Sequence, residues 1–127
     1  MEMDRVAIIV SQDGLETAFK ALNVAMAAVA MDADVHVFCT FGGLSLLRRS
    51  LDYPVPASLE PFRDQLAALP GPEALRAMAL ESGVQFIACQ MTMDLMGITA
   101  DDLIEGIPVA GAATFLSEAQ GSTTVTF

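Results

Sequence analysis

Basic residues are scarce in this chain of 127 amino acids. Six Lys and Arg stand against sixteen Asp and Glu, which gives a formal net charge of −10 and a pI of about 4.1. Proteins that bind nucleic-acid phosphates or anionic lipid do so through clustered cations. The charge balance therefore argues against nucleic-acid and membrane-surface partners.

Long apolar runs are also missing, although the chain is apolar overall. Hydrophobic residues make up 54% of it and the mean hydropathy is +0.52, which excludes intrinsic disorder. The longest run, Val24 to Met31, is far shorter than the ~20 residues that a membrane-spanning helix needs. The start, Met1 to Asp4, is acidic where a secretory signal peptide would be basic. We therefore expect a soluble, cytoplasmic protein with no membrane contact.

Charged residues of both signs are few. They form 17% of the chain, against roughly 25% in an average soluble domain. So few charges do not cover the surface of a monomer of this size, and part of that surface must be buried between subunits. We expect a homo-oligomer, such as a trimer, tetramer or hexamer.

Several familiar catalytic patterns are absent from the sequence. The glycines form neither a G-x-G-x-x-G fingerprint nor a P-loop. The one histidine, His36, falls inside an expected strand, where a packed core residue is the natural interpretation. The acidic residues are scattered along expected helix faces. The sequence thus predicts no cofactor and no metal site of the usual kinds.

Hydrophobic patterning alternates between strands and helices along the chain. Apolar and β-branched runs predict strands at residues 5–11, 35–40, 84–89, 107–110 and 122–127, the last at an edge. Helical spacing predicts helices at residues 15–29, 44–48, 72–82, 90–96, 100–105 and 111–119, the first with a capping box from Asp13 to Glu16. This order predicts a single α/β domain over 1–127, a three-layer sandwich around a mostly parallel five-stranded sheet of Rossmann-like or flavodoxin-like type.

The stretch from residue 51 to 72 differs from the rest of the chain. It holds five of the six prolines, which remove backbone donors and fix φ. We expect a long excursion there, with a helical turn or two between Leu59 and Leu69.

The two cysteines, Cys39 and Cys89, fall at the ends of the second and third expected strands, where parallel sheets bind ligands. Cys89 also precedes a helix, whose N–H groups favour a thiolate, but a buried packing role fits the same position. Cys39, between Phe38 and Phe41, is better interpreted as inert. If the first strand lies between the other two, the sulfurs are about 9–10 Å apart and no disulfide closes.

The helix after Cys89 is rich in methionine. Met91, Met93 and Met96 together with Cys89 are soft ligands of the kind that hold Cu(I). Methionines on a short helix more often fill gaps in a core or line a subunit contact, and we favour that interpretation.

Three segments resemble the DsrE/DsrF/DrsH-like family. The most specific is residues 88–98 (ACQMTMDLMGI), and residues 38–44 (FCTFGGL) and 107–116 (IPVAGAATFL) are similar to the family's turns after its second strand and into its last helix. The resemblance implies a small α/β homo-oligomer linked to sulfur trafficking. Cys89 matches the position of the family's sulfur-carrying cysteine, whereas Cys39 departs from the aromatic or small residue expected there.

The resemblance therefore implies a sulfur carrier or sulfurtransferase that holds sulfane sulfur as a persulfide on Cys89 and works with donor and acceptor proteins. The residues we expect around this site are Gln90, Met91, Met93, Phe41, Gly42 and Cys39, with the N–H groups of Gln90 and Met91 on the persulfide anion. Arg48 and Arg49 either attract an anionic donor or compensate a helix dipole, and the second role is favoured. The alternative function is a non-enzymatic oligomeric binding module.

Overall fold

The computed structural model describes residues 4–127. Met1 to Met3, whose acidic stretch was used to predict that no signal peptide is present, lie outside the described residues. Within 4–127 the chain forms a parallel sheet of five strands: β1 (Arg5–Val10), β2 (Asp34–Cys39), β3 (Gln85–Cys89), β4 (Val109–Ala110) and β5 (Thr123–Thr126). The α-helices are α1 (Leu15–Ala30), α2 (Arg63–Ala67), α3 (Pro72–Glu81), α4 (Gln90–Met96) and α5 (Ala112–Glu118). The 3₁₀ helices are η1 (Phe41–Leu47), η2 (Ala57–Phe62) and η3 (Ala100–Asp102).

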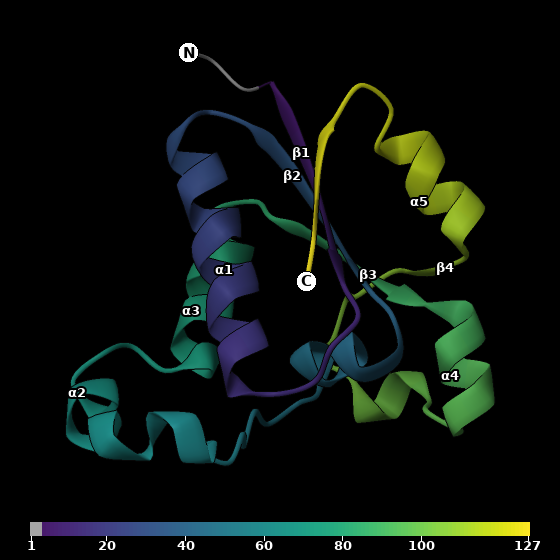
Figure 1. The fold of residues 1–127 in the computed structure, drawn as a ribbon. Coiled ribbons are helices and arrows are strands. Elements are labelled where there is room, and N and C mark those ends of the chain that lie inside the picture. Colours follow the sequence, from purple (N-terminus) through teal and green to yellow (C-terminus); the bar gives the residue numbers. More distant parts are fainter. Residues whose placement is uncertain (1–3) are drawn as a thin grey trace.

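The strand order is β4-β3-β2-β1-β5. Three strands, β2, β3 and β4, are added in sequence order on one side of β1, and the last strand, β5, returns to the opposite side of β1. Helices α1 and α3 cover one face of the sheet and α5 covers the other, which confirms the three-layer α/β fold (Figure 1). All the strands are parallel, so β1, β2 and β3 end at one edge of the sheet, where η1 and α4 begin (Figure 1).

The larger core lies between the sheet and α1 with α3. The sequence predicts an apolar stripe of large side chains on α1, and Leu15 and Leu22 are indeed buried. Phe19, Met26 and Val29 are only half-buried, and alanines fill most of the buried stripe: Ala18, Ala21, Ala25 and Ala28. Small side chains let the helix approach the sheet closely, and the larger ones then pack at its flanks.

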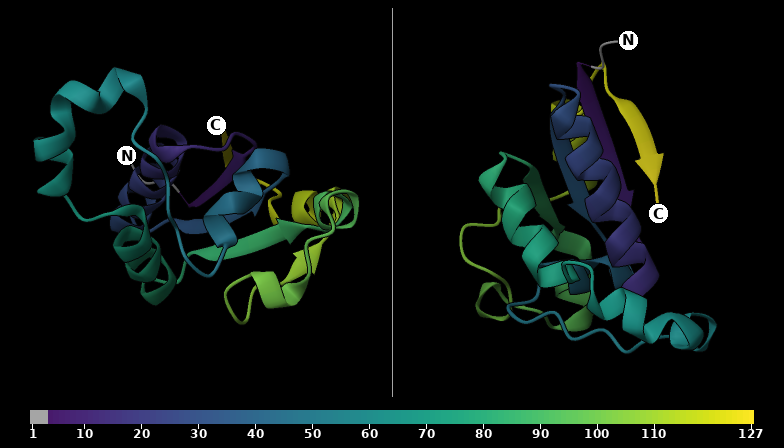
Figure 2. Two further views of the ribbon diagram at one scale, coloured as in Figure 1. Left: turned by 90° about the horizontal axis from the view of Figure 1, so that it is seen from below. Right: turned by 90° about the vertical axis from the view of Figure 1, so that its left-hand side faces the viewer.

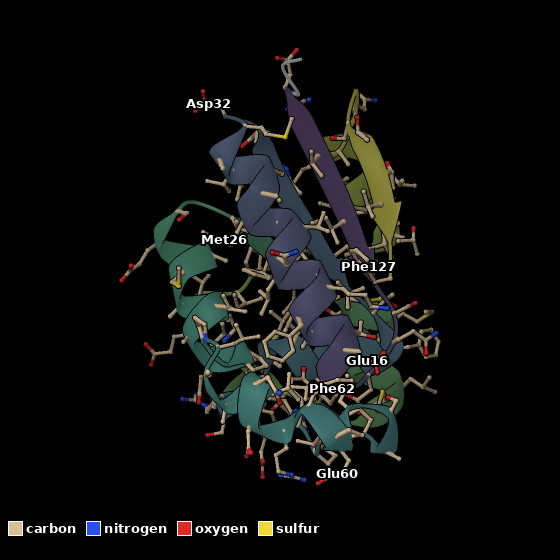
Figure 3. The ribbon with its side chains drawn as sticks, turned by 60° about the vertical axis from the view of Figure 1, so that its left-hand side comes forward. Glu16, Met26, Asp32, Glu60, Phe62 and Phe127 are labelled. Atoms are coloured by element: carbon tan, nitrogen blue, oxygen red, sulfur yellow. The ribbon has the colours of Figure 1, made fainter. Side chains whose placement is uncertain are left out.

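The expected capping box at the start of α1 is wrong. Gly14 is the N-cap, with a φ of 117° that glycine adopts readily, and the Asp13 carboxylate accepts a hydrogen bond from the N–H of Gly14 itself (2.8 Å). Glu16 instead accepts a hydrogen bond from the hydroxyl of Ser58 (2.9 Å), which joins α1 to the excursion below it (Figure 3).

The proline-rich stretch contains η2 and α2, which are the expected helical turns. Both lie beneath the start of α1 and reach away from the sheet (Figure 2). Phe62 and Leu69 of this stretch are more than half exposed. Pro72 begins α3 at its first turn, as expected from its missing N–H.

The opposite face of the sheet has a smaller core. Phe38 of β2 stacks on Phe115 of α5 with ring centroids 4.8 Å apart, and Cys89 packs in the same cluster. No helix in the described part of the chain is both long and apolar enough to cross a membrane.

The turn after β2 lies directly against the end of β1. The N–H of Thr40 donates to the carbonyl of Val10 (2.9 Å), and a Cβ added to Gly43 would overlap that same carbonyl group. Only glycine fits there without displacing the backbone.

We predict that Gly43→Ala lowers the free energy of unfolding by about 2–3 kcal/mol, because the turn or the strand must shift to admit the methyl group. Gly71→Ala is the matched control: its φ is −73°, nothing lies within 4 Å of its added Cβ, and the expected loss is below about 1 kcal/mol. Urea denaturation measures both, and equal losses would contradict the close contact.

Candidate functional site

Cys89 ends β3 and is the N-cap residue of α4. Its side chain is 3% exposed and packs in the smaller core with Phe38 and Phe115. β3 lies between β2 and β4 in the sheet, and Cys89 pairs with Ala110 of β4. The thiol therefore sits at the carboxyl edge of the sheet, the edge at which ligands bind in folds of this class.

Two threonine hydroxyls converge beside this sulfur. The Oγ1 atoms of Thr40 and Thr92 are 3.2 Å apart, and the N–H of Phe41 donates to Oγ1 of Thr92 (2.9 Å). Thr92 is completely buried. Because its oxygen already accepts from Phe41, the hydroxyl proton of Thr92 is available to a neighbouring acceptor.

Burial acts to raise the pKa of Cys89, but hydrogen-bond donors outweigh it, and the pKa lies below that of an ordinary thiol. The donors are the hydroxyls of Thr40 and Thr92 and the backbone N–H groups of Thr92 and Met91. Hydrogen bonds to the charged form favour that form. The site therefore favours a thiolate in an apolar setting.

The N–H groups that act on Cys89 differ from the expected pair, which was Gln90 and Met91. An N-cap side chain faces the second and third residues of its helix, and these are Met91 and Thr92. Helix α4 has only seven residues, and its N–H groups donate no close capping hydrogen bond to the Cys89 sulfur. The local donors, and not a long helix dipole, thus account for the lowered pKa.

The other expected site residues are only partly brought together. Met91 is 58% exposed on α4, and the side chain of Gln90 donates to the Asp94 carboxylate (2.9 Å) on the surface. Phe41 is 48% exposed, with a φ of 47° that is rare for an aromatic residue, and its N–H reaches Thr92. Gly42, beside it, packs close to the backbone of Asp13.

Cys39 lies on the other face of the sheet. It pairs with Ala88, and both belong to the larger core, whereas Cys89 belongs to the smaller one. Cys39 is fully buried, and burial raises its pKa far above the usual range, so its thiol stays protonated. Both cysteines are free.

The first strand does not lie between the two strands that end in cysteine, as the disulfide prediction supposed. β2 and β3 are neighbours, so β1 does not separate the two cysteines. The pleat of the sheet separates them. Ala88 pairs with Cys39 and points to the same face. Cys89 is the next residue of β3, and successive side chains of a strand point to opposite faces.

The methionines do not form a soft ligand set around Cys89. Met93 is 5% exposed and packs in the larger core, while Met91 and Met96 are more than half exposed. Among residues 4–127, no group of three His, Cys, Asp or Glu side chains is placed to hold a metal ion. Met93 and Cys89, which a Cu(I) site would need together, therefore lie in different cores.

Sequence reasoning missed Thr40 and Thr92. Thr92 stands three residues after Cys89, the position in a helix that faces the N-cap side chain, and that spacing is the signal that could have identified it. Thr40 follows β2 directly, but only the adjacency of β2 and β3 brings it beside the sulfur.

The chain is similar to known proteins over most of its length. Residues 2–72 and 64–127 match the DsrE/DsrF/DrsH-like family. The sulfur carrier protein DsrE2 of Allochromatium vinosum is 32% identical, over 91% of this chain and 92% of that protein. The uncharacterized protein YrkE of Bacillus subtilis is 29% identical, over 91% of each chain.

Solved structures share the fold. A protein of unknown function from Methanobacterium thermoautotrophicum superposes with a TM-score of 0.65 and 19% identity, over 98% of this chain and 99% of that one. The ychN protein from E. coli gives a TM-score of 0.59 and 17% identity, over 98% of this chain and all of that one.

We predict that Thr92→Val slows alkylation of Cys89 by iodoacetamide at neutral pH by roughly tenfold, the scale of one hydrogen bond to a charged group. The pH at which the rate is half-maximal should move upward, because the thiolate loses a donor. Thr92→Ser keeps the hydroxyl and should retain the wild-type profile. Site-resolved mass spectrometry follows the rate, and identical profiles for the valine variant and the wild type would exclude the role of this hydroxyl.

Proposed function

This chain belongs to the DsrE/DsrF/DrsH-like family, and on that premise we propose that it is a sulfur carrier that holds sulfane sulfur as a persulfide on Cys89. The observation that carries the proposal is the convergence of hydrogen-bond donors on a buried thiol whose pKa is lowered. A packing cysteine has no need of such donors. The name of the 32% identical relative, a sulfur carrier protein, supports the same role.

The chemistry is a thiol exchange that needs no external oxidant. The Cys89 thiolate attacks the outer sulfur of a donor persulfide, the S–S bond of the donor breaks, and the donor leaves as a thiolate. The reverse exchange on an acceptor thiolate releases the sulfur. One S–S bond forms as another breaks in each step, so the protein acts as a relay with no net redox change.

The surroundings of Cys89 suit the storage of a persulfide anion. The hydroxyls of Thr40 and Thr92 lie beside the sulfur and lower the pKa of Cys89, so they favour negative charge there. The packing of Phe38 and Phe115 limits the access of water and oxidants. A reducing compartment keeps Cys89 available as a thiol, and we therefore assign the relay to the cytoplasm, with sulfur donor and acceptor proteins as partners.

We also propose that α4 contacts a second copy of this chain. Its exposed surface carries Met91, Leu95 and Met96, each more than half exposed, and Met91 and Leu95 share a face at a spacing of four residues. Clustered apolar side chains of this kind mark interaction surfaces, and a chain with 17% charged residues has few charges to cover them.

Leu95→Glu should reduce the oligomer to smaller species, because a carboxylate buried without a partner disfavours association. Leu69→Glu is the matched control, since Leu69 is 56% exposed but lies outside α4. Light scattering after size-exclusion chromatography gives the mass of each. A monomeric wild type, or an oligomer that survives Leu95→Glu, would contradict the proposed contact.

The sulfur-carrier proposal predicts that wild-type protein exposed to inorganic polysulfide gains one sulfur atom, which a reductant removes. Cys89→Ser should show no gain, and Cys39→Ser should behave as the wild type because Cys39 is buried on the other face. Intact-mass spectrometry measures the gain. If the wild type stays unmodified while its thiol is shown to be free, the carrier role fails and the non-enzymatic binding module takes its place.

A further inference from the structure

A pocket of about 620 Å³ lies between the turn after β2 and the segment that follows α4. One wall is η1 with the residues that follow it, and the other runs from the end of α4 through η3 to Leu103. Its apolar lining includes Phe41, Met96 and Ile98. The volume falls within the range of sites that bind small molecules.

Two arginines give this pocket its charge. Arg48 and Arg49 both line it and both are exposed. Within residues 4–127, neither has a carboxylate within 4.0 Å, whereas Arg63 and Arg76 are paired with Glu60 and Glu73. Two unpaired guanidinium groups side by side are unexpected in a chain of net charge −10.

Both arginines are held in place through their backbone. The guanidinium of Arg76 is buried and donates to the carbonyls of Leu46, Arg48 and Arg49. Nε of Arg49 also donates to the carbonyl of Asp101 across the pocket (2.6 Å), which leaves its terminal N–H groups for another acceptor. The cations are therefore positioned before any ligand arrives.

Three carboxylates line the same pocket, so the site is not simply cationic. Asp102 is engaged, since it accepts hydrogen bonds from the N–H and hydroxyl of Thr99. Asp13 and Asp101 have no such partner across the pocket, although Asp13 accepts from the adjacent N–H of Gly14. A site whose guanidinium groups and carboxylates form no ion pairs with one another matches a ligand that carries both signs of charge.

The pocket is joined to Cys89 through Phe41. Phe41 lines the pocket, and its backbone N–H donates a hydrogen bond to the hydroxyl of Thr92 beside the sulfur. Met96 lines the pocket from the end of α4, the helix that Cys89 begins. The turn at Phe41 and helix α4 therefore border both the pocket and the cysteine site.

We propose that this pocket binds a small zwitterionic thiol of the cysteine or glutathione type, with Arg48 and Arg49 on its carboxylates and Asp13 and Asp101 on its ammonium group. This inference rests on the proposed function, because it names the persulfide of such a thiol, R–S–SH, as a donor to Cys89. The Cys89 thiolate attacks the outer sulfur, the S–S bond of the donor breaks as a new S–S bond forms on Cys89, and R–S⁻ leaves. Cys89–S–SH then releases its proton to solvent.

Binding is tested without sulfur transfer. The probes are S-methylglutathione and S-methylcysteine, which cannot form a persulfide, titrated calorimetrically into Cys89→Ser protein. We expect both to bind, and the further changes Arg48→Gln with Arg49→Gln to weaken binding at least tenfold. Arg63→Gln removes an arginine outside the pocket and should leave the affinity unchanged. Absence of binding at millimolar concentration, or equal affinity in the double variant, would overturn the proposal.

The zwitterionic preference has its own probe. N-acetyl-S-methylcysteine lacks the ammonium group and should bind at least fivefold more weakly than S-methylcysteine. Equal binding would show a simple anion site and overturn the assigned role of Asp13 and Asp101.

The two proposals fail in different ways. If polysulfide loads Cys89 but the S-methyl probes do not bind, the pocket proposal is wrong and the carrier role stands. If the probes bind and Cys89 accepts no sulfur from polysulfide, the carrier role is wrong and the pocket still binds its ligand.

Discussion

The hydrogen bonds of the Thr92 hydroxyl hold together the end of the sheet where β2 and β3 have their carboxyl termini. This hydroxyl accepts a hydrogen bond from the N–H of Phe41, lies against the hydroxyl of Thr40, and is completely buried. It thereby joins the turn after β2 to the helix after β3. A positive φ at an aromatic residue costs about 1–3 kcal/mol, so the strained turn at Phe41 persists only because its surroundings hold it. The same contact that fixes this turn places a donor beside Cys89.

The two cysteines show how much a few donors change a buried thiol. Both side chains are almost completely buried, and burial alone disfavours the thiolate in each. No hydrogen bond from the described part of the chain offsets the effect of burial at Cys39, and its pKa is raised. Cys89 has two hydroxyls and two N–H groups, and its pKa is lowered. Within one sheet, therefore, the depth of burial and the hydrogen-bond donors near each thiol together determine which sulfur is suited to chemistry.

Local pattern predicted the elements well, because each depends on neighbours in the chain. Apolar runs identified the strands, Pro72 the start of α3, and Gly97, in the left-handed region, the end of α4. Contacts between distant residues were not predictable in this way. Strand order is set by how the crossovers pack, and it decides which strands lie beside Cys89. Thr40 and Thr92 come from segments 52 residues apart, so no spacing rule pairs them.

The return of β5 to the side of β1 has a consequence for how the protein is made. The first strand of the sheet is bounded by the last one, with the N–H of Phe127 donating to Ile9 and the N–H of Ser11 donating to Phe127. While the ribosome is still adding α5, one side of β1 has an unpaired backbone. Such an edge is open to pairing with other chains. The synthesis of β5, and not the burial of the main core, is therefore the step that covers this side of β1.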